Sequence, residues 1–148
     1  MEYRVKAAFL LNFTKFVEWP AAELPDSNSL GICILGADPF GTALDRITAG
    51  ESVNERKLTV LRNRPNAPKA CQVLFVSKSE RDYPQALAGF SRGVLTVGES
   101  DAFLRDGGMI AFVIENRRVR FDINQRAVAN AGLKISSKLL SVARSVEK

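Results

Sequence analysis

The chain has 148 residues and a net charge of +5, with 46% hydrophobic and 25% charged residues, the composition of an ordinary globular domain. It contains no histidine, which removes the commonest general base and metal ligand and so excludes hydrolase triads and histidine metal sites. The basic residues are scattered, so the positive charge indicates a solvated surface and no nucleic-acid partner. We therefore predict one domain over residues 1–148, not an enzyme, with no metal and no cofactor.

A core-facing helix is predicted from Glu2 to Val17, and the Trp-Pro pair at residues 19–20 ends it. The apolar residues that recur at helical spacing are Val5, Phe9, Phe13 and Phe16. Asn12 falls on the same face, so we expect a buried amide that needs partners. No apolar run approaches the roughly 20 residues that span a bilayer. No cleavage site follows the first run, so we expect any export signal outside this chain.

Strands then alternate with short helices, which is the pattern of a parallel βαβ sheet. Strands are predicted at residues 30–36, 57–63, 72–77 and 93–98. Helices are predicted at residues 38–50, 79–90 and 99–108. In the first of these helices proline lies near the start, in the second Ser79 is the expected N-cap, and in the third glycines end the helix. The first strand is apolar throughout, as expected of a strand covered on both faces.

An antiparallel hairpin is predicted where Met109–Glu115 and Arg118–Asn124 are separated by only two residues, since a parallel crossover needs many more. This turn sets Glu115 opposite Arg118 and places Val119, Phe121 and Ile123 on the core face. The other face then carries Arg118, Arg120, Asp122 and Asn124. Residues 125–133 and 136–146 are predicted to close the chain as two helices hinged at Gly132.

These elements predict an α/β fold of the Rossmann-like or flavodoxin-like kind. It has a mostly parallel sheet of about six strands, a C-terminal antiparallel hairpin strand, and helices on both faces. If its strand order is 2-1-3-4-5, the strands that carry Cys33 and Cys71 are neighbours and their sulfurs can come within bonding distance. In a reducing cytosol the same residues are two buried thiols, so the residues alone leave both states open.

Two segments resemble anion sites. Gly36–Thr42 has the first and sixth glycines of a phosphate-binding loop, but threonine occupies the position of the required lysine. A tight strand-to-helix turn explains these glycines without a ligand. In the second segment, Ser136, Ser137 and Lys138 precede an apolar run. The Ser-x-x-Lys spacing of a serine nucleophile is not met, whereas a serine N-cap needs only this position. An anion held at the same helix start, with Lys134 and Lys138 supplying charge, is compatible with the cap.

Several segments together resemble the YfiR-like family of small secreted bacterial proteins, in the right order over almost the whole chain. They are YRVKAAFLLNFTKFVEWP, ICILGADPFG, CQVLFVSKSE, VLTVGE, GGMIAFVIENRRVRFDIN and AGLKISSKLLSVA. The resemblance implies a periplasmic, noncatalytic, homodimeric regulator. Such a regulator binds the periplasmic domain of a membrane diguanylate cyclase, or of a similar sensor, and lowers cyclic di-GMP synthesis.

The resemblance also implies a disulfide between Cys33 and Cys71. The best-known member has a second disulfide, for which this chain has no cysteines. That member also binds small ligands such as guanosine monophosphate near its last helix, through basic residues that include a histidine. Because this chain lacks histidine, that site carries over at best as Ser136–Lys138. Our candidate residues for a small anionic ligand are thus Lys134, Ser136, Ser137, Lys138, Arg118 and Arg120.

Overall fold

The computed structural model describes residues 2–20, 28–62, 71–80, 82–88 and 92–148. Its helices are α1 (Glu2–Phe16), α2 (Ala43–Thr48), α3 (Tyr83–Ala88), α4 (Gln125–Asn130) and α5 (Ser137–Val142). The first five strands are β1 (Val17–Glu18), β2 (Ser29–Leu35), β3 (Ser52–Val53), β4 (Arg56–Arg62) and β5 (Val73–Val76). The others are β6 (Leu95–Gly98), β7 (Ile110–Glu115), β8 (Arg118–Asn124), β9 (Lys134–Ile135) and β10 (Ser145–Glu147).

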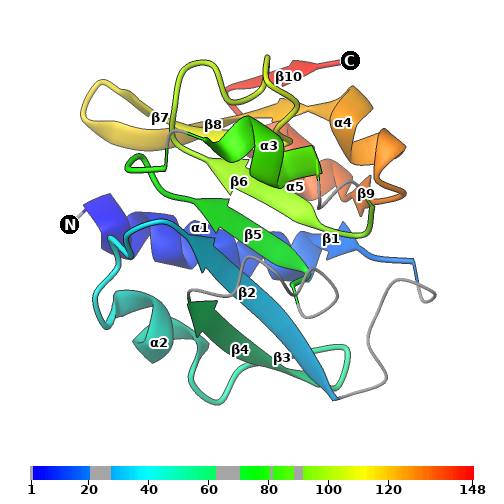
Figure 1. Cartoon of the computed structure of the whole chain (residues 1–148). Helices are drawn as coiled ribbons and strands as arrows, with labels where there is room; N and C mark the ends of the chain where they lie inside the picture. The colour runs from blue at the N-terminus through cyan, green and yellow to red at the C-terminus, as the bar shows by residue number, and fades with distance from the viewer. Residues whose placement is uncertain (1, 21–27, 63–70, 81, 89–91) are drawn as a thin grey trace.

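The main sheet has the order β10-β8-β7-β6-β5-β2-β4-β3 (Figure 1). Strands β4, β2, β5, β6 and β7 are parallel and follow the doubly wound order 2-1-3-4-5. Strand β8 pairs with β7 in antiparallel register. The α/β class and the mostly parallel sheet are therefore confirmed. Within the described residues the sheet has eight strands where about six were expected, because the short strands β3 and β10 extend its two edges. Strands β1 and β9 form a separate pair.

Two apolar layers cover the two faces of the sheet, as predicted. Figure 1 shows α1 behind the sheet and α3 in front of it. The larger layer joins α1 and α2 to inward side chains of the strands, for example Leu10, Leu44 and Phe75. The smaller layer packs Tyr83 and Leu87 of α3 against the opposite face. The prediction of helices on both faces is therefore confirmed.

The buried face of α1 differs from the predicted stripe. Val5 is 39% exposed and Asn12 is also exposed, whereas Phe13 is fully buried. The residues that α1 buries are Lys6, Ala7, Leu10, Leu11, Phe13 and Thr14. The helix packs against α2 as well as the sheet, so its buried face is rotated toward α2. The expectation of a buried Asn12 amide is therefore wrong.

Residues 99–108 form turns where a short helix was expected. These turns lay the buried ring of Phe103 against Gly98 and Gly108, where an added Cβ would come within 2.4 Å and 2.1 Å of the ring. A helical path would give up this close packing, which only glycine permits. Here tertiary packing outweighs the local sequence preference for a helix.

The N-cap predicted at Ser79 is also wrong, because α3 begins at Tyr83. The Ser79 hydroxyl instead accepts a hydrogen bond from the Ala37 backbone N–H at 3.0 Å. Pro39 likewise lies outside α2, which begins at Ala43. In both places the chain spends several residues in a loop at the sheet edge before its helix begins.

The predicted hairpin register is confirmed in every pair, from Glu115 opposite Arg118 to Ile110 opposite Ile123. Asp122 departs from the solvated face assigned to it and is 9% exposed. The cause is the C-terminal end of the chain, where residues 145–147 form β10 beside β8 and do not continue the predicted helix. Arg144, just before β10, donates two hydrogen bonds to the Asp122 carboxylate, at 2.9 Å and 2.6 Å.

The structure contains the disulfide between Cys33 and Cys71, which confirms that prediction. Cys33 lies in β2 and Cys71 lies just ahead of β5, with 5.6 Å between their Cα atoms. Both side chains are buried, at 3% and 1% exposure. The pairing follows from strand order, because β2 and β5 are direct neighbours.

Candidate functional site

The carboxyl edge of the parallel sheet contains the point where neighbouring strands continue to opposite faces. Strand β2 leads to α2 in the larger apolar layer, whereas β5 leads to α3 in the smaller one. In doubly wound sheets ligands bind in the crevice at such a point. Gly36 makes the turn after β2 with φ of +92°, in the left-handed region that glycine tolerates. The turn explanation of the Gly36–Thr42 segment therefore accounts for its first glycine.

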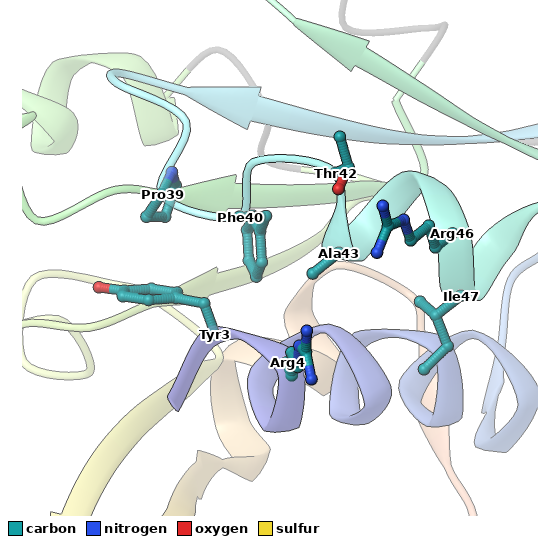
Figure 2. A pocket seen from close by; sticks show the side chains of 8 residues that line it. All are labelled: Tyr3, Arg4, Pro39, Phe40, Thr42, Ala43, Arg46 and Ile47. Atoms are coloured by element: carbon teal, nitrogen blue, oxygen red, sulfur yellow. The ribbon is translucent and has the colours of Figure 1, made fainter. Parts of the chain in front are cut away.

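A groove of about 720 Å³ lies at this edge, between α1 and the segment that follows β2 (Figure 2). Its lining residues are Tyr3, Arg4, Pro39, Phe40, Thr42, Ala43, Arg46 and Ile47. Phe40 forms the buried end of the lining, with 4% exposure and its ring 4.8 Å from that of Phe75. The Tyr3 ring meets Phe40 edge-on at 5.6 Å. The groove thus combines an aromatic interior with two arginines.

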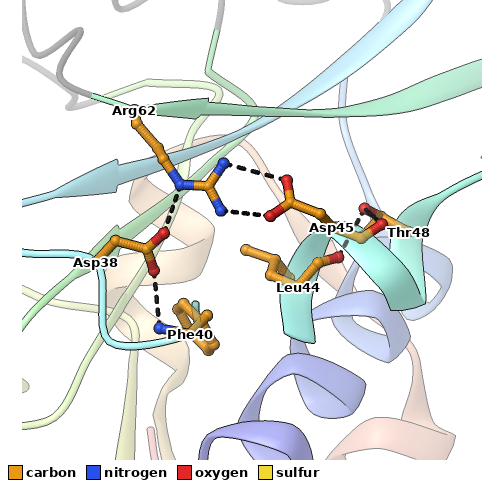
Figure 3. A network of polar contacts seen from close by, with 6 residues as sticks. All are labelled: Asp38, Phe40, Leu44, Asp45, Thr48 and Arg62. Atoms are coloured by element: carbon orange, nitrogen blue, oxygen red, sulfur yellow. Dashed lines mark hydrogen bonds and ion pairs between the residues drawn. The ribbon is translucent and has the colours of Figure 1, made fainter. Parts of the chain in front are cut away.

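An ion-pair network fixes the wall of the groove that follows β2 (Figure 3). Arg62, at the end of β4, contacts Asp38 through its Nε and donates two hydrogen bonds to Asp45, at 2.8 Å and 3.1 Å. Asp38 also accepts the Phe40 backbone N–H at 2.8 Å. Hydrogen bonds to Asp45, the larger effect, and to Asp38 raise the pKa of Arg62. One guanidinium therefore ties the loop, α2 and β4 together.

A buried ion pair lies beside the groove. Lys6 of α1 is 1% exposed, and its Nζ donates to the carboxylate of Glu99 at 2.6 Å and to Glu2 one turn earlier. Glu99 follows β6 at the same sheet edge and also accepts the Lys78 backbone N–H at 3.2 Å. The hydrogen bond from Lys6 is the main reason why the pKa of Glu2 is lowered. Helix α1 and the residue Lys78 therefore both contact the carboxylate of Glu99, which belongs to a third segment.

Tyr3 connects this ion pair with the groove. The Lys6 ammonium lies 4.7 Å from the centre of the Tyr3 ring, in cation–π contact. Burial, followed by the hydrogen bond to the Glu99 carboxylate, raises the pKa of the Tyr3 hydroxyl strongly. The hydroxyl therefore stays protonated at neutral pH and serves as a hydrogen-bond donor.

The predicted serine cap is confirmed. Ser136 is the N-cap of α5, and its hydroxyl accepts the Lys138 backbone N–H at 3.2 Å. Ser137 is the first residue of the helix. A pocket of about 440 Å³ brings Lys134, Ser136 and Lys138 together with Lys15, near the end of α1, and Glu18, in β1. The capping hydroxyl and this N–H are engaged with each other.

The two arginines of the hairpin are not part of that pocket. Figure 1 shows the turn between β7 and β8 on the left and β9 on the right. Arg118 is exposed, and Arg120 contacts Glu115 at 3.4 Å within its own hairpin. The structure therefore does not gather all six predicted anion-site residues in one place.

Sequence reasoning missed the groove and the buried pair. The helical spacing of Glu2 and Lys6 was a local signal for their contact, but nothing local indicates that Glu99 completes it. Within the described ranges no group of three or more Asp, Glu or Cys side chains is arranged to hold a metal ion. None of the described helices is long and apolar enough to cross a membrane.

Comparison with known proteins identified a family and solved structures of related fold. The model of a family described as YfiR/HmsC-like matches residues 3–144. The crystal structure of a conserved domain protein from Vibrio cholerae O1 biovar eltor is similar, with a TM-score of 0.57 and 11% identity. The similarity covers 95% of this chain but only 60% of that one, so the present chain is shorter than its structural relative. At this identity the likeness concerns the fold alone.

Proposed function

Because this chain belongs to the YfiR/HmsC-like family, we propose that it is an exported, noncatalytic regulator that represses a membrane signalling enzyme by direct contact. The enzyme proposed is a diguanylate cyclase, whose periplasmic domain the regulator binds, so that the cyclic di-GMP level falls. The observation that carries this proposal is the family match over residues 3–144. The disulfide between Cys33 and Cys71 supports it, because disulfides persist in oxidising compartments such as the periplasm.

A regulator that acts by contact needs a rigid, folded surface more than a reactive group. The chain has no histidine, and its ion pairs tie elements together, as Arg62 does for β4, α2 and the preceding loop. We propose that the regulator acts as a homodimer. Sedimentation of the purified protein is expected to give twice the mass of one chain.

Deletion of the gene tests the regulatory proposal. In a bacterium that carries this gene and its membrane cyclase, deletion is expected to raise cyclic di-GMP, and the full-length gene supplied in trans is expected to restore the original level. Deletion of the cyclase as well should abolish the rise, because the regulator then has no target. In parallel, the purified protein should co-elute with the periplasmic domain of that cyclase. An unchanged cyclic di-GMP level without co-elution would contradict the proposal.

A second candidate function is sensing of a small anion at the pocket beside α5. It is favoured by the grouping of Lys15, Lys134 and Lys138 around the cap Ser136. Against it, Glu18 lines the same pocket, and the cap already uses the Lys138 N–H. Arg118 and Arg120 are outside the pocket and are not needed by this candidate.

Calorimetric titration with phosphate and with guanosine monophosphate tests this second candidate. Millimolar or tighter binding that Lys138→Ala weakens would support it. Ser136→Ala alone should cost about 1 kcal/mol of stability through loss of the cap. Absence of heat at millimolar concentrations would leave the serine with its capping role only.

A further inference from the structure

The groove between α1 and α2 has the position and size of a ligand site that neither candidate function uses. It opens at the carboxyl edge of β2, where the chain turns toward α2 while the neighbouring β5 leads to the other face. Its volume of about 720 Å³ lies in the range of roughly 300 to 1,000 Å³ typical of small-molecule sites. The cap pocket beside α5 is lined by a separate set of residues.

The charge of the groove comes from two arginines whose side chains have no partner among the described residues. Arg4 of α1 and Arg46 of α2 are both exposed, and neither guanidinium forms an ion pair or hydrogen bond with a described residue. Figure 2 shows both guanidinium groups extending toward the space beside Ala43. Two such groups, each with several N–H donors, suit a phosphate or a carboxylate.

No carboxylate is among the residues that line the groove, and the acidic side chains nearby face other bases. The acidic side chains on α1, on the loop, on α2 and directly after it are paired as follows: Glu2 with Lys6, Asp38 and Asp45 with Arg62, and Glu51 with Lys15. Asp38 and Asp45 share one guanidinium, so these pairs do not cancel charge one for one. The charged residues of the lining itself are Arg4 and Arg46, so the lining is positive.

The remainder of the lining is apolar, apart from the hydroxyls of Tyr3 and Thr42, and that of Tyr3 is bonded to Glu99. Tyr3, Pro39 and Ile47 are half-buried and give a ligand apolar surface to contact. Thr42 precedes α2, but its side chain makes no capping hydrogen bond. Its hydroxyl is exposed and can bond to a ligand.

The groove is also held in shape before any ligand arrives. The Arg62 network fixes the loop and α2, and the Phe40 ring is packed against Phe75. Tyr3 is held from the other side by Lys6 and Glu99. A preformed site spends less free energy on ordering side chains when it binds.

We propose that this groove binds a small organic anion, a phosphate or carboxylate with an apolar ring or chain. The anionic group lies between Arg4 and Arg46, within reach of Thr42, and the apolar body contacts Tyr3 and Ile47. Such a molecule satisfies both halves of the lining, whereas an inorganic ion leaves the apolar half unused. This inference does not rest on the proposed regulatory function and stands or falls separately.

Phenyl phosphate is a suitable probe because it joins the two halves in one small molecule. Titration of the full chain, followed by calorimetry and by NMR shifts of the groove residues, is expected to give a dissociation constant of about 1 mM or tighter. Inorganic phosphate and phenol, each supplying one half, should bind at least about tenfold more weakly. Added salt should weaken the binding, because the charged contact is exposed.

Matched variants locate the site. Arg46→Ala should weaken phenyl phosphate binding by about tenfold or more, the loss expected for a charge-assisted contact. Arg118→Ala, which removes another exposed arginine, on the distant hairpin, should leave binding unchanged, and so should Lys138→Ala. Arg46 is exposed and unpaired among the described residues, so its variant should fold normally. No binding at about ten times the expected dissociation constant, or binding lost with Lys138→Ala and kept with Arg46→Ala, would overturn the proposal.

Discussion

Lys6 is the residue whose environment departs most from expectation. Lysine is rarely buried unless it is paired, yet here it is 1% exposed and bonded to two carboxylates. An ion pair in the interior gains less than its geometry suggests, because both charges lose their hydration. Removal of only one partner is costly, however, because the other charge stays buried alone.

We therefore predict that Lys6→Met destabilises the protein by about 3 to 5 kcal/mol. The double variant Lys6→Met with Glu99→Gln should recover much of this loss, because the amide carries no charge and can still accept the Lys78 N–H. Urea denaturation of both variants measures the effect. Equal destabilisation in the single and double variants would show that packing around Lys6, and not its charge, determines the loss.

The serine cap and the buried lysine show which single-residue roles can be predicted. The cap at Ser136 depends on residues within one turn, and the sequence predicted it correctly. The burial of Lys6 depends on Glu99, which is 93 positions away. Local spacing carries the first kind of information and not the second. The sequence did not indicate that Arg4 and Arg46 line one groove for the same reason, because α1 and α2 come together only in the folded chain.

Among the elements, the β7–β8 hairpin was the most accurately predicted. A two-residue turn fixes which residues face each other, and the alternation of apolar and polar side chains fixes which face is buried. By contrast, the helix expected at residues 99–108 is absent, because the close packing of Phe103 on Gly98 and Gly108 overrides a weak local signal. The secondary structure of a short segment without a strict repeat therefore depends on the residues that pack against it in the fold.

For the hairpin we predict that Phe121→Ala costs about 3 to 5 kcal/mol of stability. Phe121 is 1% exposed and its ring contacts those of Phe9 and Phe13. Arg118→Ala should change stability by less than about 0.5 kcal/mol, because Arg118 is exposed. Arg120→Ala should also be mild, since a surface contact such as its pair with Glu115 contributes at most about 1 kcal/mol. Thermal or denaturant unfolding distinguishes the three.

The ion pair of Arg144, just before β10, with Asp122 of β8 makes this edge of the sheet sensitive to acid. Burial, the largest single effect, raises the pKa of Asp122. The hydrogen bonds from Arg144 and Ser145, together with the positive charges of Arg144 and Arg120, outweigh burial and leave the pKa below its ordinary value of 3.8. A carboxylate with a lowered pKa in the folded state stabilises that state at pH values above its ordinary pKa. The contribution is lost as the pH falls through the lower, folded-state value.

We therefore predict that Asp122→Asn flattens the fall in unfolding free energy between about pH 5 and pH 2. Arg144→Gln should flatten it in the same way, and the double variant should add little, because both changes remove one ion pair. Unfolding free energies measured at a series of pH values provide the comparison. A slope unchanged in both single variants would mean that other carboxylates determine the acid sensitivity.

At the scale of the whole molecule, the alternation of strands and helices predicted a mostly parallel sheet and left few strand orders. The order 2-1-3-4-5 was considered only as a condition, and the structure shows it. That order made β2 and β5 neighbours, which accounts for the disulfide between Cys33 and Cys71. The edge strands β3 and β10 were not predicted, because each is only two or three residues long. The groove was also missed, since its lining comes from α1 and from the segment after β2 together.

We predict that reduction of this disulfide lowers the stability of the fold by about 4 kcal/mol, the chain-entropy value for a closed loop of this length. The two cysteines are 38 positions apart. Denaturant unfolding with and without a reducing agent measures the difference. As a control, mass analysis after alkylation of the nonreduced protein should find no modified cysteine, and two modified cysteines would contradict the bond.

The same disulfide determines how the molecule yields to mechanical force. When the two ends are pulled apart, the chain between Cys33 and Cys71 cannot extend, because the bond carries the load past it. That segment spans 38 positions, so at about 3.4 Å per residue the fully stretched molecule is roughly 130 Å shorter than its reduced form. The shielded segment contains α2, β3 and β4. One wall of the groove therefore belongs to a part of the chain that tension does not extend while the disulfide is intact.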